Sequence, residues 1–364
     1  MGDLLPHQIA SPTRRTPPPP AKPAPSLPPR PARVAAVRTL LGPADPSARQ
    51  LALGIRGITR RNFDRHVAPL VARHWPALRR LPFFAKLRLG ACDLYASSPY
   101  TVLFCASRPP LLLRVVTTAG DRLPLPAPAL GLLGRAALEV LGRVAFLEQH
   151  RRIVQIASFI VVVDHVLDHC LDGTPDERGA LLHAIIDGLA PPATPELALT
   201  RALVVAMGDR LESDERAAFE AAMVRVHDWI RAEVRAMNGE PDPEGLGHRR
   251  AGTEGTIDGL LFPLVRWTGE GARRWMYDVA MFMQILDDWF DAEADLAVGR
   301  STPVLEGRWT FDDVERAWRR TVDNLESLVR AAGTRSPHYV RFVRQAYALM
   351  LGEVIDVMAR RPEL

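Results

Sequence analysis

The sequence predicts an all-α protein, a single bundle of roughly ten or more helices. Three observations support this class. Apolar residues recur at steps of three and four over most of the chain, which is the spacing that lines one face of a helix. Clusters rich in glycine and proline, such as Gly173-Thr174-Pro175 and Gly239-Glu240-Pro241, separate these periodic segments. Long alternating runs of β-branched residues, the pattern of half-buried strands, are missing.

The apolar periodicity also places the individual helices. It runs through Phe84–Tyr95, Leu130–Leu147, Arg151–Leu171, Arg178–Leu189, Glu196–Arg210, Asp214–Met237, Ala272–Asp295, Phe311–Ala332 and Tyr339–Met358. Thr101–Cys105 and Leu111–Thr117 are the two segments that could instead form short strands, with Pro109-Pro110 between them.

The N-terminal 35 residues differ from the rest because they are rich in proline, including the run Pro17 to Pro20. Proline removes a backbone donor and fixes φ, so this stretch cannot nucleate a packed helix. We therefore predict a disordered tail at residues 1–35 and one all-helical domain at residues 36–364. No internal repeat divides that domain.

Cysteine usage and hydropathy exclude several classes. Cys92, Cys105 and Cys170 have no spacing typical of a disulfide framework or a structural zinc site, which indicates a reducing compartment. A membrane-spanning helix needs about 20 uninterrupted apolar residues. The nearest candidate, Leu123–Leu147, is interrupted by charges and prolines. We therefore expect a cytoplasmic protein, with peripheral membrane contact left open.

The chain carries a formal net charge of +4 and has a pI near 9.2. Almost all of its cations are arginines, and Lys22 and Lys86 are the only lysines. This balance permits anionic ligands. No basic block with interleaved aromatic residues points to nucleic acid, so we expect no nucleic-acid partner.

Two acidic clusters carry the functional signal. Asp164, Asp168 and Asp172 stand at i, i+4 and i+8, directly after the apolar run 153–163. On an α-helix this spacing stacks side chains on one face, with about 6 Å between neighbours. Carboxylates beside a buried run need a partner, and a hard cation is a natural one.

The second cluster repeats the pattern. Asp287, Asp291 and Asp295 again stand four residues apart at the end of an apolar helical run. A single acidic ladder is ordinarily a solvated helix face. Two ladders, each emerging from a core-forming helix, instead favour a metal site.

The cation that fits best is Mg²⁺. It prefers oxygen ligands, keeps several waters, and is typically held by one or two carboxylates together with substrate phosphates. We therefore predict that the two ladders face each other and bind a diphosphate through bridging Mg²⁺ ions.

The same segments resemble motifs of a known family, the class I isoprenoid synthase superfamily. Asp164-His-Val-Leu-Asp168 resembles its first aspartate-rich motif, DDxxD. Residues 284–300 resemble the second motif of its squalene/phytoene synthase branch, QxxNxxRDxxxDxxxGR, and residues 249–255 resemble that branch's VAGTVG segment. The resemblance covers about residues 150–305 and implies helices around a central apolar cavity.

The resemblance implies roles for individual residues. The predicted metal ligands are Asp164 and Asp168 from one wall, and Asp287, Asp291 and Asp295 from the other; of these, Asp164, Asp168, Asp291 and Asp295 are the predicted catalytic carboxylates. Four further residues are expected to bind the substrate diphosphate or its metal cluster: Arg249, Arg250, Gln284 and Arg300.

The implied function is Mg²⁺-dependent ionisation of an allylic isoprenoid diphosphate, with release of diphosphate and prenyl coupling of the squalene/phytoene type. The chain departs from that branch at Val161, where an arginine is usual, and after Arg300. Its second ladder also occupies the metal-ligand positions of the NSE motif of terpene cyclases. A cyclase acting on one prenyl diphosphate is therefore the alternative.

Histidines suggest two alternative functions of other classes. His165 and His169, together with His183, could form a different metal centre. His227-Asp228 is the dipeptide of HD-type metal phosphohydrolases. A non-catalytic helical protein is the third alternative. Mg²⁺-dependent release of diphosphate separates an enzyme from such a scaffold.

Overall fold

The computed structural model describes residues 27–42, 46–106, 132, 136, 147–209, 211–240, 247–265, 269–331 and 337–360. All regular secondary structure in these ranges is helical, which confirms the all-α class. The strand alternative is wrong for Thr101–Cys105, which lies in helix α5 (Ser97–Ala106). There the Thr101 hydroxyl donates to the Ser97 carbonyl one turn back, as helical threonines do. Leu111–Thr117 lies outside the described residues.

The remaining helices follow the predicted periodicity in the C-terminal two thirds of the chain and add elements before it. In chain order they are α1 (Arg30–Leu41), α2 (Pro46–His66), α3 (Ala68–His74), η1 (Pro76–Arg80), α4 (Pro82–Arg88), η2 (Leu89–Ala96), α8 (Leu147–His165), η3 (Val166–Cys170), α9 (Pro175–Asp187), α10 (Pro195–Gly208), α11 (Ser213–Met237), α12 (Gly247–Thr253), η4 (Glu254–Leu261), α13 (Phe262–Leu264), α14 (Glu270–Ala297), α15 (Phe311–Ala331) and α16 (Pro337–Arg360). Apart from its last residue, the predicted helix Leu130–Leu147 is described only at residues 132 and 136.

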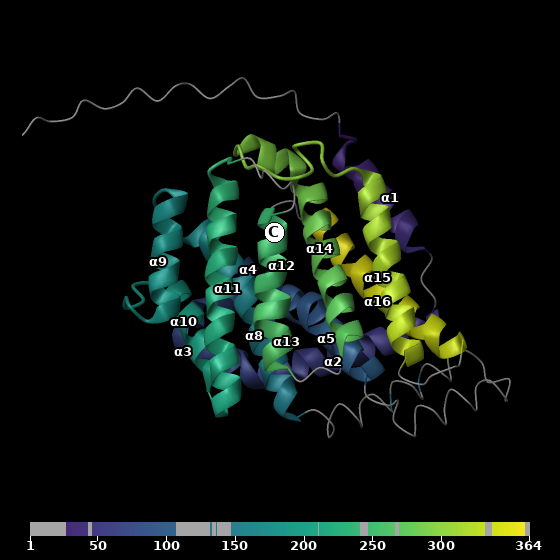
Figure 1. Cartoon of the computed structure of the whole chain (residues 1–364), viewed down its shortest axis with the longest axis horizontal. Helices are drawn as coiled ribbons and strands as arrows, with labels where there is room; N and C mark the ends of the chain where they lie inside the picture. Colours follow the sequence, from purple (N-terminus) through teal and green to yellow (C-terminus); the bar gives the residue numbers. More distant parts are fainter. Residues whose placement is uncertain are drawn as a thin grey trace, which may run out of the picture.

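Helices α11, α12, α14 and α15 run side by side, with α8 behind them (Figure 1). The apolar run of α8 is buried throughout residues 153–163. This helix contacts α2, α4, η2, α10 and η4, so it forms the centre of the bundle.

Helix α8 with η3 is also the one described segment long and apolar enough to cross a membrane by length and composition, over Gln149–Cys170. Of its apolar window, 72% is buried inside the protein. A central core helix passes the same test, so this is weak evidence for a membrane span.

Helix α1 begins at Arg30, so regular structure starts before the predicted boundary at residue 36. Pro31 lies in the first turn, where its missing N–H would be unpaired in any case. Arg33 is 1% exposed, and its guanidinium donates to both carboxylate oxygens of Glu293 and to the Phe290 carbonyl of α14. Residues 1–26 lie outside the described ranges.

Three π-helical segments continue α-helices: η2 follows α4, η3 follows α8, and η4 follows α12. In a π-helix the backbone bonds run from i to i+5, so each turn is wider and side chains leave the α-helical register. Such segments are frequent at functional sites. Here η3 carries Asp168, and η2 and η4 both contact α8.

Candidate active site

The first acidic cluster spans a change of helix type. Asp164 lies in the last turn of α8, and Asp168 lies in the π-helical η3. The helix ends at Leu171 (φ −110°, ψ 133°), and Thr174 begins α9 with a capping box to Glu177. Asp172 is therefore exposed outside the helix. The predicted third rung of this ladder is wrong, because the helix ends before Asp172, where Leu171 is extended.

The second cluster keeps its regular spacing. Helix α14 is α-helical through Ala297, so Asp287, Asp291 and Asp295 share one face as predicted. The neighbouring residues 288–290 point into the core and are buried. Because of this amphipathic pattern, the three carboxylates face away from the core side of α14.

Arg300 joins the two clusters. It follows Asp295 by five residues, after the chain reverses at Gly299 (φ 72°). Its Nη1 lies 3.2 Å from Asp168 Oδ2, and its Nη2 lies 2.5 Å from Glu233 Oε2 of α11. The segment that follows α14 is thus in direct contact with the first acidic cluster, through an arginine 16% exposed at its side chain.

Asp164 and Asp287 also lie close enough to repel each other. The pKa of Asp164 is raised to about 7, first by burial and next by the charge of Asp168, with further contributions from Asp287 and Glu233. Its side chain nevertheless reaches solvent. The carboxylate therefore reaches water while many protein atoms surround it. Those surrounding atoms explain why its pKa is raised although its side chain is exposed.

Asp291 behaves in the same way. Burial and the charge of Asp287 raise the pKa of Asp291 to about 7 against the opposing effect of Arg30 and Lys86. Arg30 Nη2, from the first turn of α1, lies 3.6 Å from Asp291 Oδ1. The N-terminal helix therefore supplies a cation to the second ladder.

Two carboxylates at the centre of the site have no protein partner. Among the described residues, the side chains of Asp164 and Asp287 make no hydrogen bond and no ion pair. By contrast, Asp168 is bound by Arg300 and Asp291 by Arg30. The site thus holds like charges that the protein compensates only in part.

Gln284 is held against the segment that resembles VAGTVG. Its Nε2 donates to the Thr253 hydroxyl at 3.0 Å. A Cβ added at Gly252 would lie 3.1 Å from Gln284 Nε2 and 3.2 Å from Trp229 Cδ1, and one at Gly255 would lie 3.1 Å from the Arg225 carbonyl. Small residues at 252 and 255 therefore allow η4 and α12 to pack closely on α11 and α14.

The predicted arginines of that segment lie elsewhere or outside the described side chains. Arg250 is exposed and hydrogen-bonds to Tyr277 of α14. Tyr277 precedes Asp287 by about 15 Å along the helix axis, so this contact does not bring Arg250 to the carboxylates. The side chain of Arg249 is outside the described part of the chain.

Sequence reasoning missed three charged residues of the site: Arg30, Lys86 and Glu233. Arg30 lies in the stretch predicted to be tail, and Glu233 is a buried acid of α11. Lys86 acts on Asp164 and on Asp291. The one available signal was that Lys86 is the only lysine within the predicted domain.

The histidine alternatives gain little from the geometry. His165 stacks on Phe83, with ring centroids 3.5 Å apart, whereas His183 packs against His227. His227 Nε2 is 2.8 Å from Asp187 Oδ1. The acid of the HD dipeptide, Asp228, pairs instead with Arg231.

Within the described residues, no group of three or more His, Cys, Asp or Glu side chains is arranged to hold a metal ion by itself. Any divalent cation at the ladders would need ligands beyond the protein. Comparisons of the chain with protein-family models, with curated proteins and with solved structures find no match.

Proposed function

We propose that this protein catalyses Mg²⁺-dependent ionisation of an allylic isoprenoid diphosphate, with release of diphosphate and prenyl coupling of the squalene/phytoene type. One observation carries the proposal. Two acidic segments more than a hundred residues apart meet at one site, where Arg300 binds Asp168 and where Asp287 repels Asp164.

The donor set fits Mg²⁺ bound to phosphate. The unpartnered carboxylates of Asp164 and Asp287 are hard oxygen ligands, and the protein atoms around Asp164 make its charge costly without a cation. A complete protein cage is not required, because Mg²⁺ in such sites takes one or two carboxylates and completes its shell with water and phosphate oxygens. The residues that would hold it are Asp164 and Asp168 on one side and Asp287, Asp291 and Asp295 on the other.

In the proposed reaction the site must stabilise the negative charge that develops on the leaving diphosphate. The C–O bond of the allylic ester breaks, and its electron pair leaves with the diphosphate. Mg²⁺ held there would supply Lewis-acid stabilisation of that leaving group. Preorganised charges of this kind are usually the largest catalytic contribution.

The remaining residues orient the site. Arg300 holds Asp168 against α11 by pairing with it and with Glu233, which fixes the first wall relative to the second. Gln284 is oriented by Thr253. The buried run 153–163 of α8 directly precedes Asp164, and a carbocation protected from water would need apolar surroundings of this kind.

The test is release of diphosphate by the purified full chain incubated with geranyl, farnesyl or geranylgeranyl diphosphate, with Mg²⁺ or with EDTA. We expect Mg²⁺-dependent release, and we expect Asp164→Ala and Asp291→Ala to abolish it with an unchanged far-UV helical signal. Asp172→Ala is the matched control, because this acid lies outside the helix and should retain activity. Wild-type turnover in both site variants would refute the proposal.

Product analysis then separates the two kinds of enzyme. Coupling consumes two prenyl donors per product, whereas a cyclase consumes one. Absence of any Mg²⁺-dependent diphosphate release with all three donors would favour the non-catalytic alternative.

A further inference from the structure

Helix α4 lies against α8 at the first acidic cluster. The Phe83 ring stacks on His165 with centroids 3.5 Å apart and planes at 12°. A Cβ added at Gly90 would lie 2.9 Å from Val161 Cγ2, so the two backbones approach closely there. The chain of α4 and η2 therefore runs alongside α8 from the level of His165 to that of Val161.

Lys86 lies between these two contacts and on the same side of its helix. Residues 83 and 86 are spaced i and i+3 within α4, which places them on one face of that helix. On α8, Asp164 lies between Val161 and His165. Lys86 is therefore directed at α8 at the level of Asp164.

The electrostatics agree with this placement. The Lys86 ammonium lowers the pKa of Asp164 and of Asp291, so it acts on one carboxylate of each ladder. Lys86 is half-buried. Among the described residues it has no hydrogen bond and no ion pair within 4.0 Å.

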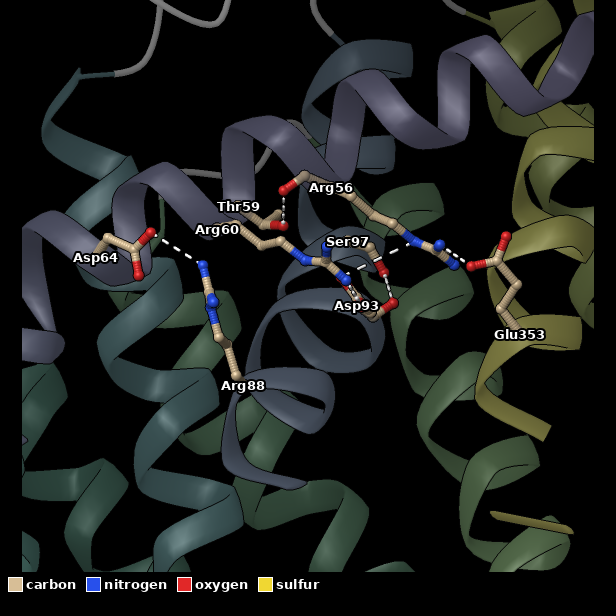
Figure 2. Close-up of polar contacts among 8 residues, drawn as sticks. All are labelled: Arg56, Thr59, Arg60, Asp64, Arg88, Asp93, Ser97 and Glu353. Carbon is tan, nitrogen blue, oxygen red and sulfur yellow. Dashed lines mark hydrogen bonds and ion pairs between the residues drawn. The ribbon is translucent and has the colours of Figure 1, made fainter. Parts of the chain in front are cut away.

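The other cation of α4 is used differently. Arg88 Nη2 lies 3.0 Å from Asp64 Oδ2 of α2, and both side chains are exposed (Figure 2). Arg88 is thus engaged in a surface ion pair, and Lys86 is not.

The backbone that carries Lys86 is firmly anchored. Asp93 of η2, 2% exposed, accepts from Arg60 at 2.7 Å and lies 3.9 Å from Arg56 Nε (Figure 2). Arg56 also pairs with Glu353 of α16. These charges tie η2, which continues the helix of Lys86, to α2 and α16.

We propose that Lys86 borders the site on a third side and binds the diphosphate of the substrate. Its ammonium donates hydrogen bonds to phosphate oxygens. This rests on the proposed function. The carboxylates that Lys86 faces are the predicted Mg²⁺ ligands, so once they are engaged its charge is available to an anion. A lysine ammonium is a compact point charge with three donors on a flexible stem, suited to phosphate groups that move as a bond breaks.

The probe is inorganic diphosphate, titrated calorimetrically into the full chain at a fixed Mg²⁺ concentration. We expect Lys86→Gln to raise the Kd by roughly 10- to 100-fold, the effect of losing one charge-assisted hydrogen bond. Lys86→Arg should recover part of the affinity because it restores the charge. Arg88→Gln, on the same helix, should leave the Kd unchanged.

A second titration with Mg²⁺ alone separates binding of diphosphate from a structural role. We expect Lys86→Gln to bind Mg²⁺ at least as tightly as the wild type, because a repelling cation has been removed. Equal loss of Mg²⁺ and diphosphate affinity would overturn the proposal, and so would a wild-type Kd for diphosphate in Lys86→Gln. If the wild type itself binds no diphosphate, the proposed function fails with it.

Discussion

Replacing Asp164 by asparagine should stabilise the metal-free protein while abolishing diphosphate release. Asparagine keeps the shape of the side chain and removes its charge. In the folded protein that charge is opposed by burial, by Asp168 and by Asp287, and it has no ion-pair partner among the described residues. Its removal therefore relieves repulsion that the unfolded chain does not have.

The magnitude follows from the raised pKa. A shift from 3.8 to about 7 would correspond to about 4 kcal/mol without screening. Because Asp164 is solvent-exposed, screening reduces the repulsion, and we expect about 1 kcal/mol to remain. A gain of this size raises the Tm of a domain this large by about 1–3 °C.

The pH dependence has a defined sign. Below about pH 4, Asp164 is protonated in both states and the variant has no advantage. Between about pH 4 and pH 7 the unfolded chain has lost the proton that the folded protein keeps, so wild-type stability falls as pH rises. Above pH 7 the difference in the free energy of unfolding between Asp164→Asn and the wild type is constant. The advantage of Asp164→Asn should therefore grow through this window.

The assay is thermal unfolding in EDTA at pH 5, 6, 7 and 8, followed by circular dichroism. Asp172→Asn is the matched control, because this exposed acid lies beyond the end of the helix and should change stability by less than about 0.5 kcal/mol. An Asp164→Asn variant less stable than the wild type at pH 8, or one whose difference does not grow with pH, would refute the electrostatic reasoning.

Three further outcomes follow from the charged contacts. Arg300→Met removes the guanidinium that pairs with Asp168 and Glu233 and should lower the free energy of unfolding by about 2–4 kcal/mol in urea titrations; an unchanged midpoint would contradict this. Arg33→Met removes the buried guanidinium that ties α1 to α14 and should cost about 1–3 kcal/mol, with faster proteolysis within α1 as the second readout. Arg30→Gln removes the cation beside Asp291 and should tighten Mg²⁺ binding at pH 8 by up to about fivefold in calorimetric titration, whereas weaker binding would show that Arg30 supports the site.

Apolar spacing predicted the later helices well because they bury uncharged faces. Helix α14 shows this clearly, since its buried side chains recur at helical spacing along its length. The first helices were missed because charge stands where apolar residues would be expected. In α1 the buried face includes Arg33, and in α2 it includes Arg56 and Thr59. Each becomes buried only through partners far away in the chain, such as Glu293 and Glu353.

The acidic spacing identified the two acidic segments, but not how each carboxylate is presented. A pattern at i, i+4 and i+8 assumes a regular α-helix, and η3 breaks that assumption between Asp164 and Asp172. The cations at the site come from elements distant in sequence, Arg30 from α1 and Lys86 from α4. Local spacing contains no information about such contacts, which depend on the packing of the whole bundle.

The pairing of buried acids elsewhere in the chain argues that the site's unpaired charges have a purpose. Elsewhere this arginine-rich chain compensates them: Glu215 is bound by both terminal nitrogens of Arg152, at 2.7 and 2.8 Å, and Asp93 by Arg60. A charged carboxylate that loses hydration without gaining an ion-pair partner lowers the stability of the folded protein. One more arginine beside Asp164 would have removed that loss of stability. Where stability alone decides, such a charge has no advantage, so its presence is best explained by a cation that arrives with the ligand. If Asp164→Asn neither gains stability without metal nor loses diphosphate release, this explanation fails and the ladder is an ordinary solvated acidic face.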